Sequence, residues 1–346
     1  MSNFRTRQAP SPTGYLHLGT ARTVLFTVLF SLVNNGNWFL RLEDTDRARL
    51  QPEAAINLLE VLYELGLNPS EGVSLYPQSA KQQRDDFYGL YQNGKYAPYI
   101  QSNSLSFHLQ HAQNLIDRKL AYWSYLDQEA RDDLQEIKKV NKKAINYFKA
   151  SLDDLANKGK TETELYTDVQ TALNHIEKPV LRYKMMRDQK LDCYDKLLGK
   201  TSFDLTLEED FVILKSDGFP TYHLAHLVDD YLMKTTLVIR SQEWYASLPK
   251  HIVMFKDYWN IHDNSEADPE FMLDGDNGQG VPNYIHVPFI LGEVGNSKMS
   301  KRDGNVNMQE YIDKGYTQEA LLNYLAFLGF NPGTEKELYL SSSDFE

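Results

Sequence analysis

Two short segments of the sequence combine residue types that can bind a phosphorylated nucleotide. The first, Ser11–Thr20, contains prolines and glycines that fix a tight turn, so backbone N–H groups and the start of the following helix can face an anion. Within it, His17 can donate a hydrogen bond to a phosphate, and Gly19 lets a flat ring approach the backbone. The alternative is an ordinary turn in which His17 only caps the next helix.

The second segment, Lys298–Arg302, carries three cations in five residues, and Gly295 and Gly304 flank it. Such a stretch can wrap a triphosphate and neutralise the negative charge that builds up as pyrophosphate leaves. A charge run of this kind, taken by itself, is more commonly a solvated surface.

Together, and after a strand–loop–helix–strand opening, the two segments resemble the ATP signatures of class I aminoacyl-tRNA synthetases, His-x-Gly-His and Lys-Met-Ser-Lys-Ser in relaxed forms. Neither a Gly-x-Gly-x-x-Gly fingerprint nor a Walker lysine loop occurs in the chain. Further stretches look like the glutamyl-tRNA synthetase family in particular: residues 7–14, 40–47, 215–225, 228–230, 239–240 and 243–244. The resemblance covers roughly residues 4–125 and 179–335, whereas 126–178 match no known pattern.

The resemblance implies a glutamate pocket. Glutamate has two carboxylates and one ammonium group, so a selective pocket needs forked cations and one carboxylate. By resemblance, Arg7 and Arg240 bind the substrate carboxylates and Glu43 binds the amino group. Ser11 and Tyr222 complete the site. Which arginine binds which carboxylate is left open. The alternative for Arg7 and Glu43 is a surface ion pair between neighbouring strands.

The resemblance also implies an ATP site, drawn from both signatures and from the stretch after Arg240. Its residues are Pro12, Thr13, His17, Gly19, Thr20, Glu243, Trp244, Lys298 and Lys301. Of these, His17, Lys298 and Lys301, together with Ser300, are the expected catalytic residues, and Asp46 and Arg47 are expected at the 3′ end of the tRNA. Mg²⁺ shared among the ATP phosphates is expected, and no zinc or other protein-bound metal.

Three departures from the family pattern stand out. His226 occupies a position where many relatives have asparagine, which puts that pocket contact in question, and Thr20 replaces a frequent glycine. The zinc-binding cysteines of some relatives are absent. The single cysteine, Cys193, also excludes an internal disulfide and fits a reducing compartment.

The implied reaction is ATP-dependent ligation of L-glutamate to the terminal adenosine of tRNA(Glu). Attack of the glutamate α-carboxylate on the α-phosphate of ATP gives glutamyl-adenylate, and the 2′-hydroxyl of the tRNA then takes the acyl group. Family behaviour implies that adenylate formation waits for tRNA. One alternative is a paralogue that places glutamate on the queuosine base in the anticodon of tRNA(Asp), and a second is a non-catalytic nucleotide- or tRNA-binding relative. Glutamine is a further candidate substrate, although two pocket arginines favour an acid over an amide.

Composition limits where such partners can bind. The formal net charge of the 346 residues is -12, so nucleic acid cannot bind over the whole surface, and a local basic groove must make the phosphate contacts. The longest dense apolar run, Val24–Val33, is half the ~20 residues that a membrane span needs. No secretion signal precedes Pro10. We therefore expect a cytoplasmic protein without a membrane span, and a monomer.

The elements that position these residues begin with a strand over Phe4–Ala9. A helix is predicted from Leu18 to Asn34, a strand over Trp38–Leu42 and an amphipathic helix from Pro52 to Gly66. Ligands bind beyond the carboxyl ends of parallel strands, so the loops at 10–20 and 43–47 should face one crevice. The expected fold class is α/β, a Rossmann-like doubly wound parallel sheet.

The rest of the chain predicts an insertion and a return to the sheet. Residues 127–178 are charged and helix-prone, and strand-like runs follow at 179–187 and 210–214 and then at 221–238. The expected domains are 1–95, the first half of the catalytic domain; 96–200, an acceptor-binding insertion; 201–315, the second half; and 316–346, the start of a helical stem-contact region. No anticodon-binding domain is expected, so the chain would be the catalytic part of a longer enzyme or a short paralogue.

Overall fold

The computed structural model describes residues 4–79, 82–187, 189–259, 281–291, 306–331 and 333. The predicted catalytic residues Lys298, Ser300 and Lys301 lie outside these ranges.

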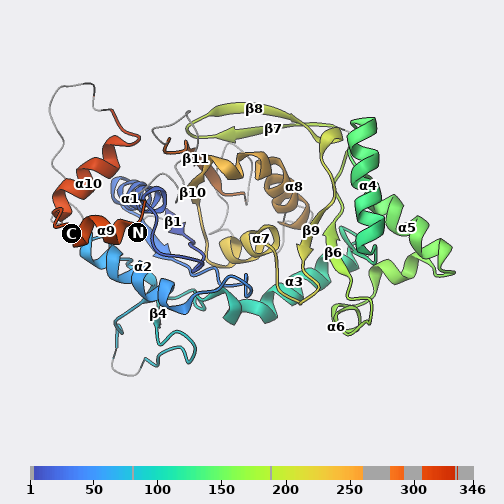
Figure 1. Cartoon of the computed structure of the whole chain (residues 1–346), viewed down its shortest axis with the longest axis horizontal. Coiled ribbons are helices and arrows are strands. Elements are labelled where there is room, and N and C mark those ends of the chain that lie inside the picture. Colours follow the sequence, from blue (N-terminus) through green and yellow to red (C-terminus); the bar gives the residue numbers. More distant parts are fainter. Residues whose placement is uncertain are drawn as a thin grey trace.

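The central sheet has six strands in the order β11-β10-β1-β2-β3-β4. Five of them are parallel, and β4 alone runs antiparallel, to its neighbour β3. Listed from the β4 edge to the β11 edge, the strands are β4 (Tyr91–Asn93), β3 (Glu71–Ser74), β2 (Asn37–Leu40), β1 (Arg5–Gln8), β10 (Leu237–Ser241) and β11 (Asn283–Val287). The predicted α/β fold with a parallel sheet is confirmed (Figure 1).

The sheet is doubly wound about β1. From β1 the chain proceeds to β2 and β3 on one side, and it returns much later to add β10 and β11 on the other side. The strand order therefore reverses between β1 and β10, and such a switch point opens a crevice at the carboxyl ends of the two strands.

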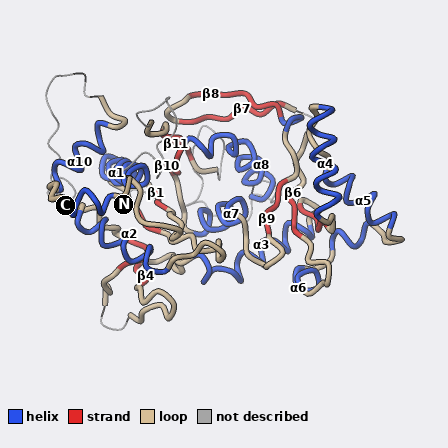
Figure 2. The backbone as a smooth tube through the Cα atoms, in the orientation of Figure 1, coloured by secondary structure: helices blue, strands red, loops and turns tan. Residues whose placement is uncertain are grey.

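Helices flank the strands: α1 (Leu18–Val33) lies on one side of β1 and β10, and α7 (Tyr222–Leu232) and α8 (Leu248–Trp259) lie on the other (Figure 2). The predicted helix from Leu18 is confirmed; Ala21, Leu25 and Val28 share its buried face. It ends at Asn34, and Asn35 has a positive φ of 49°.

The second predicted helix, α2 (Pro52–Glu64), is also confirmed. Pro52 occupies its first turn, where a missing N–H costs nothing, and Gly66 follows its end at φ 68°. After β4 come η1 (Gln101–Ser104) and α3 (Leu105–Asp117). Near the carboxyl end of the described chain, α9 (Met308–Asp313) and α10 (Gln318–Phe327) lie beside α1 (Figure 1).

The segment between the two halves of the sheet carries a separate antiparallel sheet, β5-β6-β9, formed by β5 (Ala121–Ser124), β6 (Val180–Tyr183) and β9 (Phe211–Leu214). The predicted helical insertion holds α4 (Gln128–Asn141), α5 (Tyr147–Asn157), η2 (Glu162–Tyr166) and α6 (Val169–Leu173). A long hairpin, β7 (Lys190–Asp195) with β8 (Gly199–Asp204), leads through η3 (Leu205–Leu207) to β9.

One strand-like run is mostly helix. Within 221–238 the structure has α7 followed by the first residues of β10. Leu224, Leu227 and Val228 recur at helical spacing and are fully or almost fully buried. A buried apolar run of this length fits the two-residue period of a strand as well as the 3.6-residue period of a helix. Packing against α3 and α8 stabilises the helix here.

Two buried apolar clusters support this arrangement. One joins the insertion to α7 and α8, and the other joins α1 and α2 to Met308, Leu322 and Leu325 of the carboxyl-terminal helices. In the described part of the chain, no helix has both the length and the apolar character that crossing a membrane requires.

Candidate functional site

A cavity of about 720 Å³ opens at the carboxyl edge of the sheet, at the switch point between β1 and β10. The loops after β1, β2 and β10 and the start of α1 line it. Eleven of the residues predicted for binding line this cavity: Arg7, Ser11, His17, Gly19, Thr20, Glu43, Asp46, Tyr222, Arg240, Glu243 and Trp244. Pro12, Thr13 and Arg47 are not among its lining residues.

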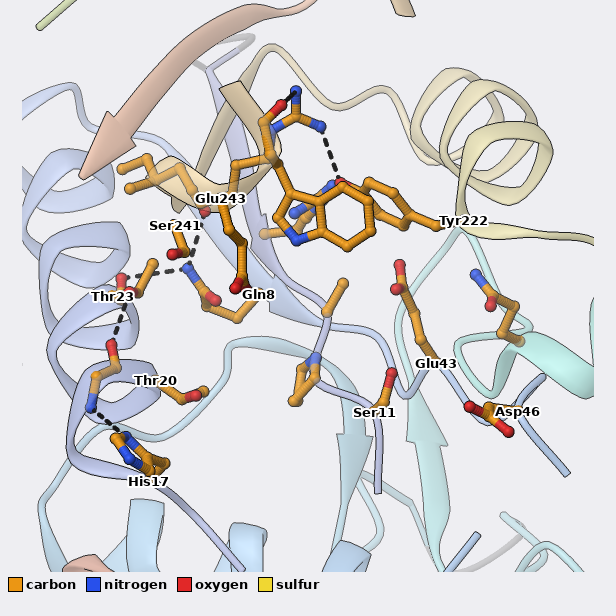
Figure 3. Close-up of a pocket in the computed structure, with 18 of the residues that line it drawn as sticks. Gln8, Ser11, His17, Thr20, Thr23, Glu43, Asp46, Tyr222, Ser241 and Glu243 are labelled. Atoms are coloured by element: carbon orange, nitrogen blue, oxygen red, sulfur yellow. Dashed lines mark hydrogen bonds between the residues drawn. The ribbon is translucent and has the colours of Figure 1, made fainter. Parts of the chain in front are cut away.

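The predicted residues divide between the two ends of the cavity. Glu43 and Tyr222 lie at one end, and His17 and Thr20 lie at the other, with Glu243 and Ser241 between them (Figure 3). The two loops expected to face one crevice do so.

The cavity is locally basic although the chain is acidic. Five cationic side chains line it, against three acidic ones. They are Arg7, Arg22, Arg49, Lys215 and Arg240, against Glu43, Asp46 and Glu243. The net charge of -12 is therefore no obstacle to an anionic ligand at this site.

His17 sits at the N-cap of α1. Its Nδ1 accepts a hydrogen bond from the backbone N–H of Gly19 at 3.0 Å. The capping contact expected from the simpler interpretation is thus present, and it also fixes the ring. A neutral imidazole that accepts at Nδ1 carries its proton on Nε2, and an N–H group of this kind is a donor that a phosphate can accept from.

The chain on both sides of residues 292–305 is attached to the first signature or to the turn of α1 that follows it. Upstream, an Arg22 Nη2–H group donates to the carbonyl of Pro288. Downstream, Leu18 N donates to the carbonyl of Val306 at 2.8 Å, and Met308 N donates to the carbonyl of Leu16 at 3.0 Å. The described residues that flank the second signature therefore lie beside the first one.

The alternative of a surface ion pair between Arg7 and Glu43 is not what the structure shows, because both residues are buried. Arg7 is 3% exposed and binds Asp230 through two hydrogen bonds, of 3.1 Å from Nε and 2.9 Å from Nη2. Asp230 also accepts from Arg41 at 2.7 Å, and Arg41 in turn donates to Glu43 at 3.0 Å. Glu43 thus belongs to a buried network in which Arg41 is its direct partner.

The charges of this network decide the protonation of its acids. Burial raises the pKa of Asp230, but Arg41 and Arg7 outweigh it and hold the pKa well below its ordinary value. For Glu43 burial prevails over Arg41 and Arg7, and its pKa is raised. A ligand ammonium group beside Glu43 would favour its ionised form.

Arg240 has a different environment. Nε donates to His286 Nε2 at 2.8 Å, and Nη1 donates to the hydroxyl of Tyr222 at 3.0 Å and to His251 Nδ1 at 3.0 Å. Its side chain is almost fully buried, yet within the described ranges no carboxylate pairs with it. These partners are neutral, so no residue that the structure describes pairs a negative charge with Arg240.

Histidines surround Arg240 and Tyr222. The ring of His226 stacks on Tyr222 at a centroid distance of 5.4 Å and an angle of 13°. Burial lowers the pKa of His226 to about 4 and that of His223 to about 3, and it holds the pKa of His251 well below its ordinary value. His226 does not line the cavity; it contacts Asp230 and donates or accepts at the hydroxyl of Tyr284.

Sequence reasoning missed several residues of this site. Arg41 and Asp230 occurred only inside stretches that look like the family, and no role was inferred for them. Arg22, Arg49, Gln101 and Lys215 line the cavity and carried no signal by spacing. Their place at the cavity depends on contacts between segments that are far apart in the sequence. Lys215, for example, donates to the carbonyl of Thr45 at 3.0 Å.

No dedicated metal site accompanies the cavity. Among the residues that the structure describes, no group of three or more histidine, cysteine or carboxylate side chains is placed to hold a metal ion. Burial raises the pKa of the single cysteine, Cys193, to about 12, so its thiol stays protonated.

Fold and cavity together define an α/β protein with a cavity at the switch point of a parallel sheet. Residues 3–344 match the family of tRNA synthetases class I (E and Q), catalytic domain. The chain belongs to this family.

Individual relatives agree with this. The glutamate–tRNA ligase of Clostridioides difficile is 34% identical over 337 residues, which are 97% of this chain and 60% of that protein. The glutamate–tRNA ligase of Chloroherpeton thalassium is 36% identical over 97% of this chain and 59% of its own length. The chain thus spans about 60% of the length of the curated relatives it matches.

A solved structure shares the fold closely. The glutamate tRNA ligase of Elizabethkingia meningosepticum, crystallised in complex with its amino acid, superposes with a TM-score of 0.75 at 29% identity. The match covers 99% of this chain and 64% of that one.

Proposed function

We propose that the protein ligates L-glutamate to the 3′-terminal adenosine of tRNA(Glu) at the expense of ATP, through glutamyl-adenylate. The observation that carries this proposal is one basic cavity with a helix-capping histidine at one end and, at the other, an arginine that pairs with no carboxylate in the described ranges. The glutamate–tRNA ligase relatives support glutamate as the amino acid and tRNA as the acceptor.

The glutamate end of the cavity is proposed to be organised by Arg240. A buried cation with only neutral partners gains most from a ligand carboxylate, since that ligand supplies the missing charge. The charge of Arg7 is already shared with Asp230, so Arg7 contributes less attraction and more orientation. Tyr222, Ser11 and Glu43 are proposed to complete the pocket, with Glu43 facing the substrate ammonium.

The nucleotide end is proposed to be organised by the start of α1. The positive end of the α1 helix dipole and the Nε2–H of His17 would face the phosphates, while Gly19, Thr20, Glu243 and Trp244 would contact the rest of the nucleotide. Lys298, Ser300 and Lys301 are proposed to act on the phosphates from the second signature. Pro12 and Thr13 are proposed to hold the loop, since the carbonyl of Pro12 accepts from Gln51 N at 2.8 Å.

The proposed mechanism needs no nucleophilic side chain. ATP enters as its magnesium complex, in which the phosphates hold the ion. An oxygen of the glutamate α-carboxylate attacks the α-phosphorus, a new P–O bond forms, and the bond to pyrophosphate breaks. The 2′-hydroxyl of the tRNA then attacks the acyl carbon, and AMP leaves. The residues of the cavity position the two substrates and stabilise developing charge.

The proposal includes the partners. Asp46, in the cavity, and Arg47, beside it, are proposed to meet the 3′ end of the tRNA. Arg47 contacts Asp44 at 3.3 Å and lies over the ring of Phe87. The insertion at 96–200 is proposed to bind the acceptor stem, and the domain boundaries and the monomeric state predicted from the sequence remain part of this proposal. Because tRNA is used in the cytoplasm, the proposal includes a cytoplasmic location for the protein.

ATP–pyrophosphate exchange with a panel of amino acids, with and without tRNA, tests the proposal. We expect exchange with glutamate, little with glutamine or aspartate, and dependence on tRNA. Exchange with another amino acid, or none with any of them, would contradict it. Bulk tRNA charged with labelled glutamate then shows where the label sits. Label on the 3′ end supports the proposal, whereas label on the anticodon base would indicate the queuosine-modifying alternative.

A further inference from the structure

A buried carboxylate near the tip of the β7–β8 hairpin is connected to the cavity residue Arg240 through His286. Asp195 is the last residue of β7 and is only 3% exposed. One of its oxygens accepts from the backbone N–H groups of Leu197 and Leu198, at 2.9 and 2.8 Å. The other accepts from the backbone N–H of His286 at 3.0 Å and from its Nδ1 at 2.7 Å.

His286 connects Asp195 to Arg240, which lines the cavity. It lies on β11, is fully buried, and its Nε2 accepts from Nε of Arg240 at 2.8 Å. Burial lowers the pKa of His286 although the hydrogen bond to Asp195 raises it, so the ring is neutral near pH 7. A neutral ring that donates at Nδ1 and accepts at Nε2 has one defined tautomer.

The series continues from Arg240 to Tyr222, whose hydroxyl accepts from Nη1 at 3.0 Å. Four side chains from four separate elements, β7, β11, β10 and α7, are thus joined by three hydrogen bonds. Each bond requires the previous one to point the right way: Asp195 must accept for His286 to accept in turn from Arg240.

We propose that Asp195 and His286 are positioning residues that fix the guanidinium of Arg240 toward the substrate carboxylate and so set the affinity for the amino acid. This rests on the proposed function of the same cavity. It gives the hairpin, which lies outside the central sheet, a direct part in amino-acid binding.

Asparagine at position 195 would reverse the tautomer of His286. The Asp195→Asn amide keeps the oxygen that accepts from Leu197 and Leu198, but its NH₂ group would face His286 Nδ1. His286 would then accept at Nδ1 and carry its proton on Nε2, opposite the Nε–H of Arg240. Two donors would meet, and Arg240 would turn away from its present direction.

Four variants test this in pyrophosphate exchange with glutamate and tRNA. Asp195→Asn and His286→Phe should raise the KM for glutamate about tenfold or more, with the KM for ATP and kcat changed less than about threefold. His286→Gln restores an acceptor for Arg240 and should lie closer to the wild type than His286→Phe. Asp192→Asn, on the same hairpin but exposed and paired with Lys200 at 2.7 Å, is the matched control and should change nothing.

The outcomes separate this inference from the proposed function. If the wild type does not activate glutamate, the proposed function is wrong and the inference falls with it. If the wild type is active and the variants lose thermal stability without any change in the KM for glutamate, only the inference is overturned. Should Asp195→Asn fail to fold, the comparison of His286→Gln with His286→Phe decides the matter: equal KM values would overturn it.

Discussion

The two arginines of the cavity differ in how their charge is met. Arg7 forms a two-bond ion pair with Asp230, whereas the partners of Arg240 among the described residues are a tyrosine hydroxyl, two imidazoles and a carbonyl. A buried cation without a carboxylate is costly unless a ligand supplies one. The energetic cost of that arrangement in the free protein is consistent with a site kept ready for an anion.

Arg240→Gln is predicted to weaken glutamate binding selectively. Loss of a charged, desolvated contact should raise the KM for glutamate by about 10- to 100-fold, while the KM for ATP changes little. Steady-state exchange kinetics with each substrate varied in turn provide the measurement. Arg84→Gln is the control, because Arg84 is exposed and is not among the residues that line the cavity. Equal effects on both KM values would argue against a glutamate-specific contact.

Lys301 belongs to the second signature and lies outside the described residues. Lys301→Ala is predicted to slow activation by about 100-fold or more, with a far smaller effect on glutamate affinity, because the lysine would act on charge that appears only in the transition state. The rate of pyrophosphate exchange with tRNA present is the measurement. An unchanged rate would remove Lys301 from catalysis.

Among the elements, the packing of β3 against β2 depends on a single glycine. Gly72 has φ 114°, and a Cβ placed there would lie 2.1 Å from the carbonyl oxygen of Leu40, on the neighbouring strand. Only a glycine allows the two backbones to approach in this way. The loop carrying Glu43 follows β2, so this approach also fixes one wall of the cavity.

Gly72→Ala is predicted to cost about 2–4 kcal/mol of unfolding free energy. Gly199 provides the control, since its φ of 76° is also positive but a Cβ there meets nothing within 4 Å. Gly199→Ala should therefore show only the backbone strain, about 1 kcal/mol. Urea unfolding gives the unfolding free energy of each variant, and the two losses are compared if the m-values are the same. Similar losses for both variants would show that the close approach is unimportant.

The elements could largely be predicted from the sequence where one period dominated. The helices from Leu18 and Pro52 showed clear 3.6-residue spacing and clear stop residues. The stretch at 221–238 did not, because a short buried apolar run fits a strand as well as a helix. The β7–β8 hairpin was not predicted, and its role in holding His286 depends on a contact across 91 residues.

Across the whole molecule, buried neutral histidines link stability to pH. Burial lowers the pKa of His226 to about 4, that of His223 to about 3 and that of His111 to about 4. In the unfolded chain these histidines bind protons below about pH 6.5. Between pH 6.5 and 4 the unfolded state therefore binds more protons than the folded state, and stability falls as the pH falls.

His226→Gln is predicted to flatten this dependence. One fewer proton is then taken up on unfolding, so the slope of unfolding free energy against pH should decrease by up to about 1.4 kcal/mol per pH unit between pH 6.5 and 4. Urea unfolding at several pH values gives the slope, which is independent of any constant loss of stability in the variant. An unchanged slope would mean that His226 is protonated in the folded protein.

At the scale of the whole molecule, the sequence predicted which residues lie together at the cavity but not which hydrogen bonds and ion pairs join them. Motif order and the βαβ opening were enough to bring His17, Glu43, Tyr222 and Arg240 to one cavity. The pairing of Arg7 with Asp230 joins residues 223 positions apart. It depends on how helix α7, which carries Asp230, packs against β1, and no local sequence pattern indicates that.

The most direct measurement is calorimetric titration with a non-hydrolysable analogue of glutamyl-adenylate, which must occupy both ends of the cavity at once. His17→Asn keeps an N-cap acceptor for α1 but removes the Nε2 donor, and Arg240→Gln removes the cation at the far end. We predict one binding site, displaced by ATP and by glutamate, with each variant weakening the analogue at least about tenfold. Binding at full affinity to both variants would contradict a shared adenylate cavity.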